Sequence, residues 1–369
     1  MTAKEIRVLH IFSSFTAGGA ENMTLQLAAE LSRKTALSAL GCPKGSYMYE
    51  KAKERSITVF DFKSRGTFTP SGVYSLYRLV RDNNINILHV HQGKLFWTAV
   101  LIHLFTFCRV KTVFHKRMQT RHKFYARAHY KFADKVIAVS KAVKNSLIKQ
   151  DNVNPEKIEV IYNGCNFKRF NDKISGLPVR AKYNVSADDI VVGTAGQMNY
   201  PKAKGQGYLI EAAVSLAKKY DNLKFIICGE GPMLDDFKEQ ARLLDVTGNV
   251  IFTGFVGDIE NYIAAMDIFS LNSWDTEGAP NVVIEAQAMK KAIIATDIGG
   301  IAETFLDGVS GLLIEPENVR ELAEKIEFFM KDKSKIKMFG AAGQEFVHKT
   351  FTVERMVDAV SGLYAGLFK

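Results

Sequence analysis

A run of ten residues that begins at Glu277 contains two carboxylates and the predicted start of a helix. Small residues at this start leave the backbone N–H groups accessible. It follows a short apolar segment, 267–271, that predicts a buried strand. Pro280 suits the first position of a helix, because proline lacks the N–H that would be unsatisfied there and its φ is already helical. Gly278 and Ala279 leave the backbone N–H groups open, so an anion could bind at the positive end of the helix.

The two acidic residues of this run suit a different ligand group. Glu277 and Glu285 are poor partners for phosphate and good acceptors for hydroxyl groups. One site that offers both kinds of contact fits a ligand with a diphosphate in its middle and hydroxyl-rich groups at its two ends. A nucleotide-sugar has this composition.

Two further loops that follow predicted strands contain glycine or lysine. Residues 196–205 include Lys202 and Lys204, either of which could neutralise a diphosphate as it leaves; a solvated loop is the alternative. Gly18 and Gly19 open a helix after the first strand, without the G-x-G-x-x-G spacing of a dinucleotide site. They either let backbone N–H groups approach a phosphate or form only a tight turn.

Three histidines lie at the ends of predicted strands in the first half of the chain. His115 is either a structural histidine or part of the site, and its position at the carboxyl end of a strand favours the site. We expect His89 and His91 to point to opposite faces of one strand, and we favour His91 as the one that faces the site.

The formal net charge of +10 is concentrated in the first half of the chain. Up to Cys165 there are 26 lysines and arginines against 11 acidic residues, and after it there are 23 against 28. A basic first half indicates a polyanionic partner. Nucleic acid is one candidate, but the sequence has no helix-turn-helix, zinc-finger or RNP pattern. An anionic membrane surface is the other candidate.

A stripe of four basic residues favours the membrane. On a helix, residues spaced by four share one face, and an apolar stripe lies beside them here. Each cation near an anionic surface contributes roughly 1 kcal/mol to binding. A solvated surface helix is the alternative. The four residues are Lys123, Arg127, Lys131 and Lys135.

Several classes of protein and site are disfavoured. The four cysteines form no C-x-x-C pair, which predicts reduced thiols in a cytosolic protein. There is no Asp-x-Asp sequence, so a metal-bridged diphosphate is not expected. The N-terminus lacks the apolar core of a signal peptide. The nearest candidate for a membrane span, 95–108, is too short and predicts a buried core helix or one partly exposed to lipid headgroups.

Short apolar strands alternate with helical patterns along the whole chain, as in βαβ units with parallel sheets. Turn-forming residues at 162–166 divide the chain, so we predict two Rossmann-like, doubly wound α/β domains that face a cleft. The first domain covers 1–165 and the second 166–350, and a last helix within 351–369 crosses back to the first. The predicted strands are 6–12, 36–41, 57–60, 85–91, 111–115, 136–140, 158–161, 190–194, 224–228, 250–253, 267–271, 292–296 and 311–314.

Over essentially the whole chain, these motifs resemble those of GT-B-fold retaining glycosyltransferases of the GT4 type. The run at Glu277 and the Gly-Gly loop carry part of this resemblance. The other matching motifs are His115, Tyr162-Asn163-Gly164, Lys204-Gly205, Gly229-x-Gly231-Pro232 and Gly299-Gly300-x-x-Glu303.

The resemblance implies a role for each of these residues. Glu277 would contact the donor sugar, Glu285 the ribose and Lys204 the departing diphosphate, while His115 would line the reaction centre. His115, Lys204 and Glu277 are thus the expected catalytic residues. The remaining residues expected to bind the donor are Gly18, Gly19, Phe255, Gly278, Ala279, Pro280, Asn281 and Val282.

One position departs from the family pattern. The family usually has an arginine where this chain has Gln197. A neutral amide keeps a hydrogen bond but loses the charge and the bidentate fork of arginine. Lys202 is the candidate for supplying the missing charge.

We therefore expect a retaining, metal-independent glycosyltransferase without a cofactor. It would move a hexosyl or N-acetylhexosaminyl group from a nucleotide-diphosphate donor to a membrane- or lipid-linked saccharide acceptor, in cell-envelope glycan or lipopolysaccharide biosynthesis. It would lie in the cytoplasm, peripherally on the inner face of the cell membrane, and bind no nucleic acid. The alternatives are a sugar-nucleotide epimerase of GT-B architecture and a non-catalytic protein that binds nucleotide-sugars.

Overall fold

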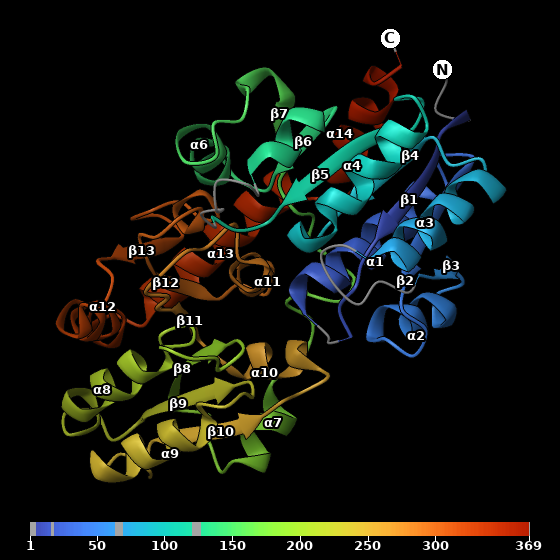
Figure 1. Cartoon of the computed structure of the whole chain (residues 1–369). Coiled ribbons are helices and arrows are strands. Elements are labelled where there is room, and N and C mark those ends of the chain that lie inside the picture. Colours follow the sequence, from blue (N-terminus) through green and yellow to red (C-terminus); the bar gives the residue numbers. More distant parts are fainter. Residues whose placement is uncertain (1–4, 16–17, 63–68, 120–126, 369) are drawn as a thin grey trace. The chain divides into compact units, whose positions relative to one another are not determined.

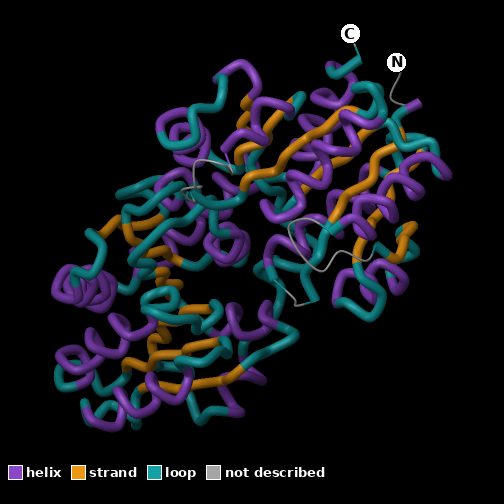
Figure 2. Tube along the Cα trace, in the orientation of Figure 1, coloured by secondary structure: helices purple, strands orange, loops and turns teal. Residues whose placement is uncertain are grey.

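The computed structural model describes residues 5–15, 18–62, 69–119 and 127–368 (Figure 1). The chain divides into two compact units, one made of Met1–Gly164 with Val353–Lys369 and the other of Cys165–Thr352. Each unit contains one parallel β-sheet with helices packed beside it (Figure 2).

The sheet of the first unit has the strand order β3-β2-β1-β4-β5-β6-β7. The order reverses between β1 and β4, which is the point of a doubly wound sheet where ligands usually bind. The strands are β1 (Arg7–Ile11), β2 (Leu37–Cys42), β3 (Thr58–Asp61), β4 (Ile87–Val90), β5 (Lys111–Lys116), β6 (Lys135–Ala138) and β7 (Ile158–Val160). The helices are α1 (Gly19–Leu31), α2 (Tyr47–Glu54), α3 (Pro70–Asp82), η2 (Gly93–Leu95), α4 (Phe96–Phe105), η3 (Ala128–Phe132), α6 (Lys141–Lys149) and η4 (Pro155–Lys157).

The sheet of the second unit has the order β10-β9-β8-β11-β12-β13, with its own reversal between β8 and β11. Its strands are β8 (Ile190–Ala195), β9 (Leu223–Cys228), β10 (Val250–Gly254), β11 (Ile268–Leu271), β12 (Ala292–Thr296) and β13 (Gly311–Ile314). Its helices are α7 (Leu177–Lys182), α8 (Gln206–Ala217), α9 (Leu234–Leu243), α10 (Ile259–Ala265), α11 (Asn281–Ala288), η5 (Ile301–Glu303), α12 (Val319–Lys331) and α13 (Ser334–Thr350). Every predicted strand is present, within a few residues of its expected ends.

The last helix, α14 (Val353–Gly366), belongs to the core of the first unit, as expected. Its buried residues include Val360 and Tyr364, which share a hydrophobic cluster with Val8 and Leu27. Burial of such side chains contributes roughly 1.5–3 kcal/mol each, which is enough to hold the helix on this unit.

The prediction of one helix through the basic stripe is wrong. Lys131 lies in the short helix η3, and Lys135 begins strand β6, where its Nζ donates to the Glu156 carbonyl. The intervening Asp134 explains the break, because its carboxylate accepts from the backbone N–H of Thr112 and ties the chain to β5. Among the remaining stripe residues, the Arg127 Nε lies 3.7 Å from an Asp151 oxygen, and Lys123 lies outside the described residues.

The apolar segment 95–108 forms η2 and α4, so the core-helix interpretation holds for its middle. Its C-terminal end is different, because Phe105 and Phe107 are 57% and 87% exposed. In the described part of the chain, no helix combines the length and the apolar composition needed to cross a membrane.

Candidate active site

Lys204 and Glu277 meet at the carboxyl edge of the second sheet. Lys204 lies in the loop between β8 and α8, and Glu277 in the loop between β11 and α11. Because β8 and β11 are adjacent strands, these loops lie side by side. The Lys204 Nζ is 2.5 Å from Glu277 Oε1, and the Ser273 hydroxyl donates to the same oxygen at 2.6 Å. The carboxylate is buried, so this charge pair is only partly screened by solvent.

Two glycines hold these loops in place. Gly299 has φ +60°, and a Cβ there would lie 2.1 Å from the Glu277 carbonyl oxygen. Gly205 has φ +75°, and a Cβ there would lie 1.8 Å from the carbonyl oxygen of Asn272. Both positions need glycine, because of the backbone conformation and because another chain segment approaches closely. The two glycines thus fix the backbone positions of Lys204 and Glu277.

The helix start predicted beside Glu277 is present, one residue later than expected. Helix α11 begins at Asn281, and Pro280 is its N-cap with φ −68° and ψ 114°. The fixed φ of proline suits both positions, and the extended ψ places this residue outside the helix. The side chain of the N-cap residue, a proline, makes no capping hydrogen bond. The positive end of the helix can therefore receive an anion.

Glu285 lies one turn into α11 and is half-buried. Burial raises the pKa of its carboxyl to about 7, with a further rise from Glu260 and an opposing effect of Arg169. Arg169 itself donates to Glu260 through Nε at 3.0 Å and NH2 at 2.7 Å. The Glu285 carboxyl is thus divided between its neutral and charged forms near pH 7.

The structure separates the two candidate lysines. Lys202 is exposed, pairs with Glu317 at 2.8 Å, and lies over the rings of Tyr208 and Trp274. Of these two lysines, Lys204 is the one that contacts Glu277. Gln197 is exposed, and its Oε1 accepts from the side chain of Asn199.

The other predicted donor-binding residues lie at the ends of strands or helices. Phe255 directly follows β10 and is 63% exposed. Gly18 is the extended N-cap of α1, no described side chain caps this helix, and Gly19 is its exposed first residue. Their roles in binding a donor stay predictions.

Sequence reasoning missed Asn272 and Ser273. Both are buried and directly follow β11, and that position at a strand's carboxyl end was the available signal. Asn272 accepts through Oδ1 from Ser270, while its buried Nδ2 has no hydrogen-bond partner among the described residues. An unsatisfied buried amide in such a loop suits contact with a ligand.

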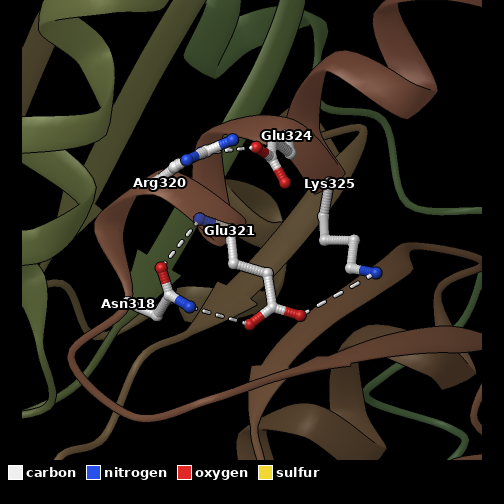
Figure 3. A pocket seen from close by; sticks show the side chains of 5 residues that line it. All are labelled: Asn318, Arg320, Glu321, Glu324 and Lys325. Atoms are coloured by element: carbon white, nitrogen blue, oxygen red, sulfur yellow. Dashed lines mark hydrogen bonds and ion pairs between the residues drawn. The ribbon is translucent and has the colours of Figure 1, made fainter.

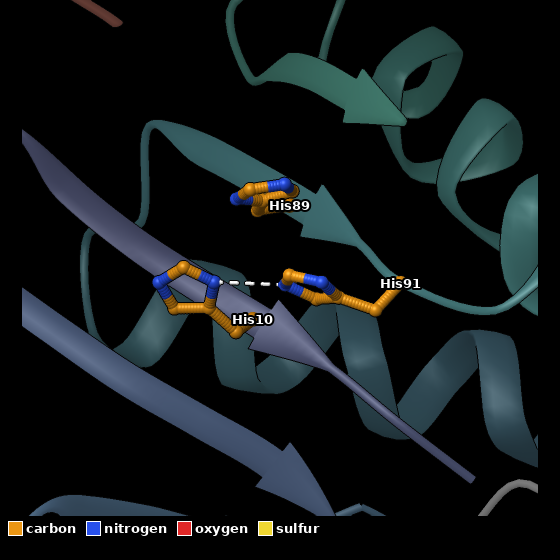
Figure 4. Close-up of side chains that lie close together, drawn as sticks. All are labelled: His10, His89 and His91. Atoms are coloured by element: carbon orange, nitrogen blue, oxygen red, sulfur yellow. Dashed lines mark hydrogen bonds between the residues drawn. The ribbon is translucent and has the colours of Figure 1, made fainter. Parts of the chain in front are cut away.

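The first unit holds four buried histidines together, in or directly after strands β1, β4 and β5. Figure 4 shows three of them, His10, His89 and His91. The expectation that His89 and His91 face opposite sides is wrong, because residues two apart on a strand share a face. Their rings stack with centroids 4.2 Å apart. His10 and His115 complete the group from the neighbouring strands.

Arg117 sets the direction of hydrogen bonding in part of this group. Its NH2 donates to Thr24 Oγ1 at 3.1 Å and lies 3.3 Å from His91 Nδ1. Arginine can only donate, so His91 Nδ1 accepts and His91 Nε2–H donates to His10 Nδ1 at 3.0 Å. Burial, followed by the Arg117 charge, lowers the pKa of His10 to about 3. These imidazoles are therefore neutral.

The histidine group also has the residue types of a metal site. One nitrogen from each of His10, His89 and His91 lies within 4.8 Å of the others. Three imidazoles are a known zinc ligand set. However, hydrogen bonds already engage these nitrogens, and the Arg117 cation touches His91. These contacts favour a hydrogen-bonded network over a cation site.

A surface hollow of about 330 Å³ lies at the start of α12 (Figure 3). None of the predicted site residues lines it. Its side chains already pair with one another, for example Arg320 with Glu324 at 2.9 Å and Asn318 with the Glu321 backbone at 3.0 Å. These pairs account for the hollow without a ligand.

Comparisons with known proteins identify the family of the chain. The family model "Glycosyltransferase Family 4" matches residues 17–169, and "Glycosyl transferases group 1" matches residues 178–346. The capsular polysaccharide biosynthesis glycosyltransferase CapM of Staphylococcus aureus is 27% identical over 243 residues, which are 64% of this chain and 63% of that protein.

A second relative comes from Campylobacter jejuni. The Campylobacter jejuni protein named N-acetylgalactosamine-N,N'-diacetylbacillosaminyl-diphospho-undecaprenol 4-alpha-N-acetylgalactosaminyltransferase is 28% identical over 211 residues, 57% of this chain and 54% of its own. The match thus spans less than two thirds of either relative's length.

A solved structure supports the fold. HepE of Anabaena, crystallised in complex with UDP and glucose, has a TM-score of 0.86 at 22% identity, covering 98% of this chain and 100% of its own. The two family matches together cover most of the chain, and the two parallel sheets agree with them. The chain belongs to the GT4-type glycosyltransferases with the GT-B fold.

Proposed function

We propose that this protein is a retaining glycosyltransferase that moves a sugar from a nucleotide-diphosphate donor to a saccharide acceptor without a metal. The observation that carries the proposal is the Lys204–Glu277 pair beside the uncapped start of α11. The cation and the helix N-terminus suit the diphosphate of such a donor, and the hydroxyl acceptor suits its sugar. The family and the names of the relatives support the same activity.

Both residues of the ion pair can change partners when the donor binds. The diphosphate competes with Glu277 for the Lys204 ammonium, because it carries more negative charge. Released from Lys204, the Glu277 carboxylate can accept from hydroxyls of the donor sugar, while Ser273 still holds one of its oxygens. Binding of the diphosphate thus prepares the contact with the sugar.

The reaction itself requires mainly electrostatic support. The bond from the anomeric carbon to the diphosphate oxygen breaks, and a bond to the acceptor oxygen forms on the same face. The leaving phosphate takes the acceptor's proton, so no enzyme nucleophile is needed. Lys204 and the N–H groups at the start of α11 would stabilise the charge that develops on the phosphate.

We propose a lipid-linked acceptor at an anionic membrane surface. The first half of the chain is basic, and Leu104, Phe105 and Phe107 are exposed at the end of α4. The exposed Arg109 lies two residues after Phe107. Apolar side chains next to cations suit the headgroup region of a membrane. The diphospho-undecaprenol in the name of the Campylobacter relative supports this acceptor class.

A pair of matched lysine variants tests the donor site. Lys204→Ala should weaken binding of UDP-, GDP- or ADP-sugars, whichever the protein takes, by about tenfold or more, since it removes a charged contact to the diphosphate. Lys202→Ala, which removes the lysine paired with Glu317, should change binding less than about twofold. Thermal shift and calorimetry with each donor measure both. Equal losses in the two variants would contradict the proposed site.

Turnover separates the proposal from its two alternatives. Incubation of donor with a lipid-linked acceptor should give a glycosylated product and free nucleoside diphosphate. An epimeric nucleotide-sugar formed without any acceptor would instead identify an epimerase. Donor binding without turnover on any acceptor, unchanged in Glu277→Ala, would identify a binding protein.

A further inference from the structure

A second hydrogen-bonded chain runs through the histidine group, from helix α14 to His115. The Tyr364 hydroxyl lies 2.5 Å from His89 Nδ1, and His89 Nε2 lies 3.2 Å from His115 Nδ1. The planes of the two imidazole rings differ by only 9°, with centroids 5.2 Å apart. The 3.2 Å between the two nitrogens is within hydrogen-bond range, so the two rings are joined nitrogen to nitrogen.

Tyr364 determines the direction of this chain. Its side chain is completely buried, and burial raises the pKa of the phenol well above its usual range, so the hydroxyl keeps its proton. Among the described residues the hydroxyl has a single hydrogen-bond partner, His89 Nδ1. If the phenol accepted from His89, its own O–H would be buried without an acceptor, at a cost of about 1–3 kcal/mol. The Tyr364 hydroxyl therefore donates.

The remaining protons follow in order. Since His89 Nδ1 accepts, the proton of neutral His89 lies on Nε2 and is donated to His115 Nδ1. Burial, followed by the charge of Arg117, lowers the pKa of His115 well below its usual range, so this ring is neutral too. Its single proton must then lie on Nε2.

The His115 Nε2–H is the open end of the chain. This atom is buried and has no hydrogen-bond partner among the described residues. A buried donor without an acceptor is costly, and such groups commonly mark a place that a ligand oxygen completes. His115 is the next-to-last residue of β5, and β5 pairs with β4, one of the two strands between which the strand order reverses.

We propose that Tyr364 and His89 are positioning residues that hold neutral His115 as its Nε2–H tautomer, so that His115 donates a hydrogen bond to a substrate oxygen and does not act as a general base. The oxygen belongs to a hydroxyl or phosphate group of a substrate of the proposed transferase, and this identity rests on the proposed function. The tautomer itself does not rest on it. Helix α14 thus acts on the substrate indirectly, because its Tyr364 orients His89 and His89 orients His115.

Nitrogen NMR of histidine-labelled protein tests the tautomer without any substrate. Long-range proton–nitrogen correlations distinguish Nε2–H from Nδ1–H imidazoles, and His115→Gln assigns the signal. The wild type should show His115 as the Nε2–H form, and Tyr364→Phe should shift it toward a mixture of both. Tyr130→Phe is the matched loss of a buried hydroxyl, since Tyr130 packs against Phe96 and His129 instead. It should leave the His115 signal unchanged. A wild-type Nδ1–H form would overturn the proposal.

Two substitutions of His89 add a kinetic test. The amide of His89→Gln can still donate to His115 Nδ1, whereas His89→Leu cannot. We expect His89→Leu and Tyr364→Phe to lower kcat by about tenfold or more with KM changed less than about threefold. His89→Gln should keep most of the activity of the wild type. Equal losses in the glutamine and leucine variants would overturn the positioning role.

The two proposals fail separately. If the NMR result holds but no donor is bound or turned over, the proposed function is wrong and the tautomer assignment stands. If the enzyme is active but His115 is the Nδ1–H form, or is unchanged in Tyr364→Phe, the positioning proposal is wrong and the function stands.

Discussion

The two units hold their candidate site residues in opposite ways. In the second unit a charged pair, Lys204 and Glu277, lies in loops at the edge of the sheet, and the lysine is about one-third exposed. In the first unit four imidazoles are buried and neutral, and the Arg117 cation lies against one of them, His91. The comparison indicates a division of work: one unit can exchange ionic partners with a ligand, and the other presents a hydrogen bond of fixed direction.

The difference follows from the backbone elements that carry the side chains, which are loops in the second unit and strands in the first. Loop residues such as Glu277 are held through backbone contacts to glycines, and their charged ends lie at the carboxyl edge of the sheet. His10, His89 and His115 lie on paired strands, so the sheet forces their rings together and away from water. Loss of solvent raises the cost of charging them, which keeps them neutral.

The largest effect should come from breaking the ionic side of this comparison. Glu277→Ala removes the hydroxyl acceptor and leaves Lys204 without its partner, so kcat/KM should fall by about 100-fold or more. Glu317→Ala breaks the corresponding pair of Lys202 and should change kcat/KM less than about twofold. Steady-state kinetics with the best donor measure both. Similar values for the two variants would remove Glu277 from the site.

The second effect concerns the surfaces of the two units. Replacing Phe105 and Phe107 by serine should lower binding to vesicles of anionic lipid by about fivefold, because it removes the exposed apolar groups beside the basic residues. Leu243→Ser, at a site that is 68% exposed in the second unit, is the control and should have little effect. Sedimentation with anionic and zwitterionic vesicles at two salt concentrations measures the binding. Salt-insensitive binding, or none to either vesicle, would contradict the membrane proposal.

A smaller effect should appear in the pH dependence of stability. The carboxyl of Glu285 has a folded-state pKa of about 7, above the ordinary value of 4.5 that it regains on unfolding. The folded state therefore binds the proton more tightly, and stability is lost as the pH rises from 4.5 through 7. Glu285→Gln lacks this loss.

The Tm of Glu285→Gln relative to the wild type should thus increase by roughly 2–4 °C between pH 5.5 and pH 8.5. Glu345→Gln changes an exposed carboxylate of the same unit and provides the control. Scanning calorimetry at both pH values measures the shifts. Parallel pH profiles for the wild type and Glu285→Gln would show that burial of this carboxyl has no such effect.

The smallest effect should come from Gln197→Arg. The side chain is exposed at the carboxyl end of β8, so an arginine can be accommodated without repacking. It would add the charge and fork that the family usually has, and the KM for the donor should fall about twofold to threefold. Asn199→Arg places the same charge two residues away and should have less effect. A higher KM in Gln197→Arg would show that the amide is needed as such.

Much of the fold was predictable from short-range patterns. All the described strands were located, because most buried parallel strands are apolar runs between polar turns, here three to six residues long. The segment around Lys135 was predicted wrongly because its basic residues have helical spacing, while the side chain of Asp134 is tied to Thr112 on another strand. A pattern in one segment cannot register such a contact.

The candidate site was predictable to a different degree in each unit. The residue types at Glu277 and Lys204 follow from the sequence, but their contact depends on the adjacency of β8 and β11. In the histidine group the sequence placed His115 in the site and favoured His91, and the pairing of strands then brought His10 and His89 beside them.

The sequence by itself therefore determined the alternation of strands and helices and the glycines, lysines and acids that follow the strands. These properties depend on neighbouring residues, so they can be read along the chain. The tertiary structure alone decided which side chains form hydrogen bonds with one another and which of them donates. The Tyr364–His89 contact joins residues 275 positions apart, and the direction of a hydrogen bond depends on every donor and acceptor buried with it.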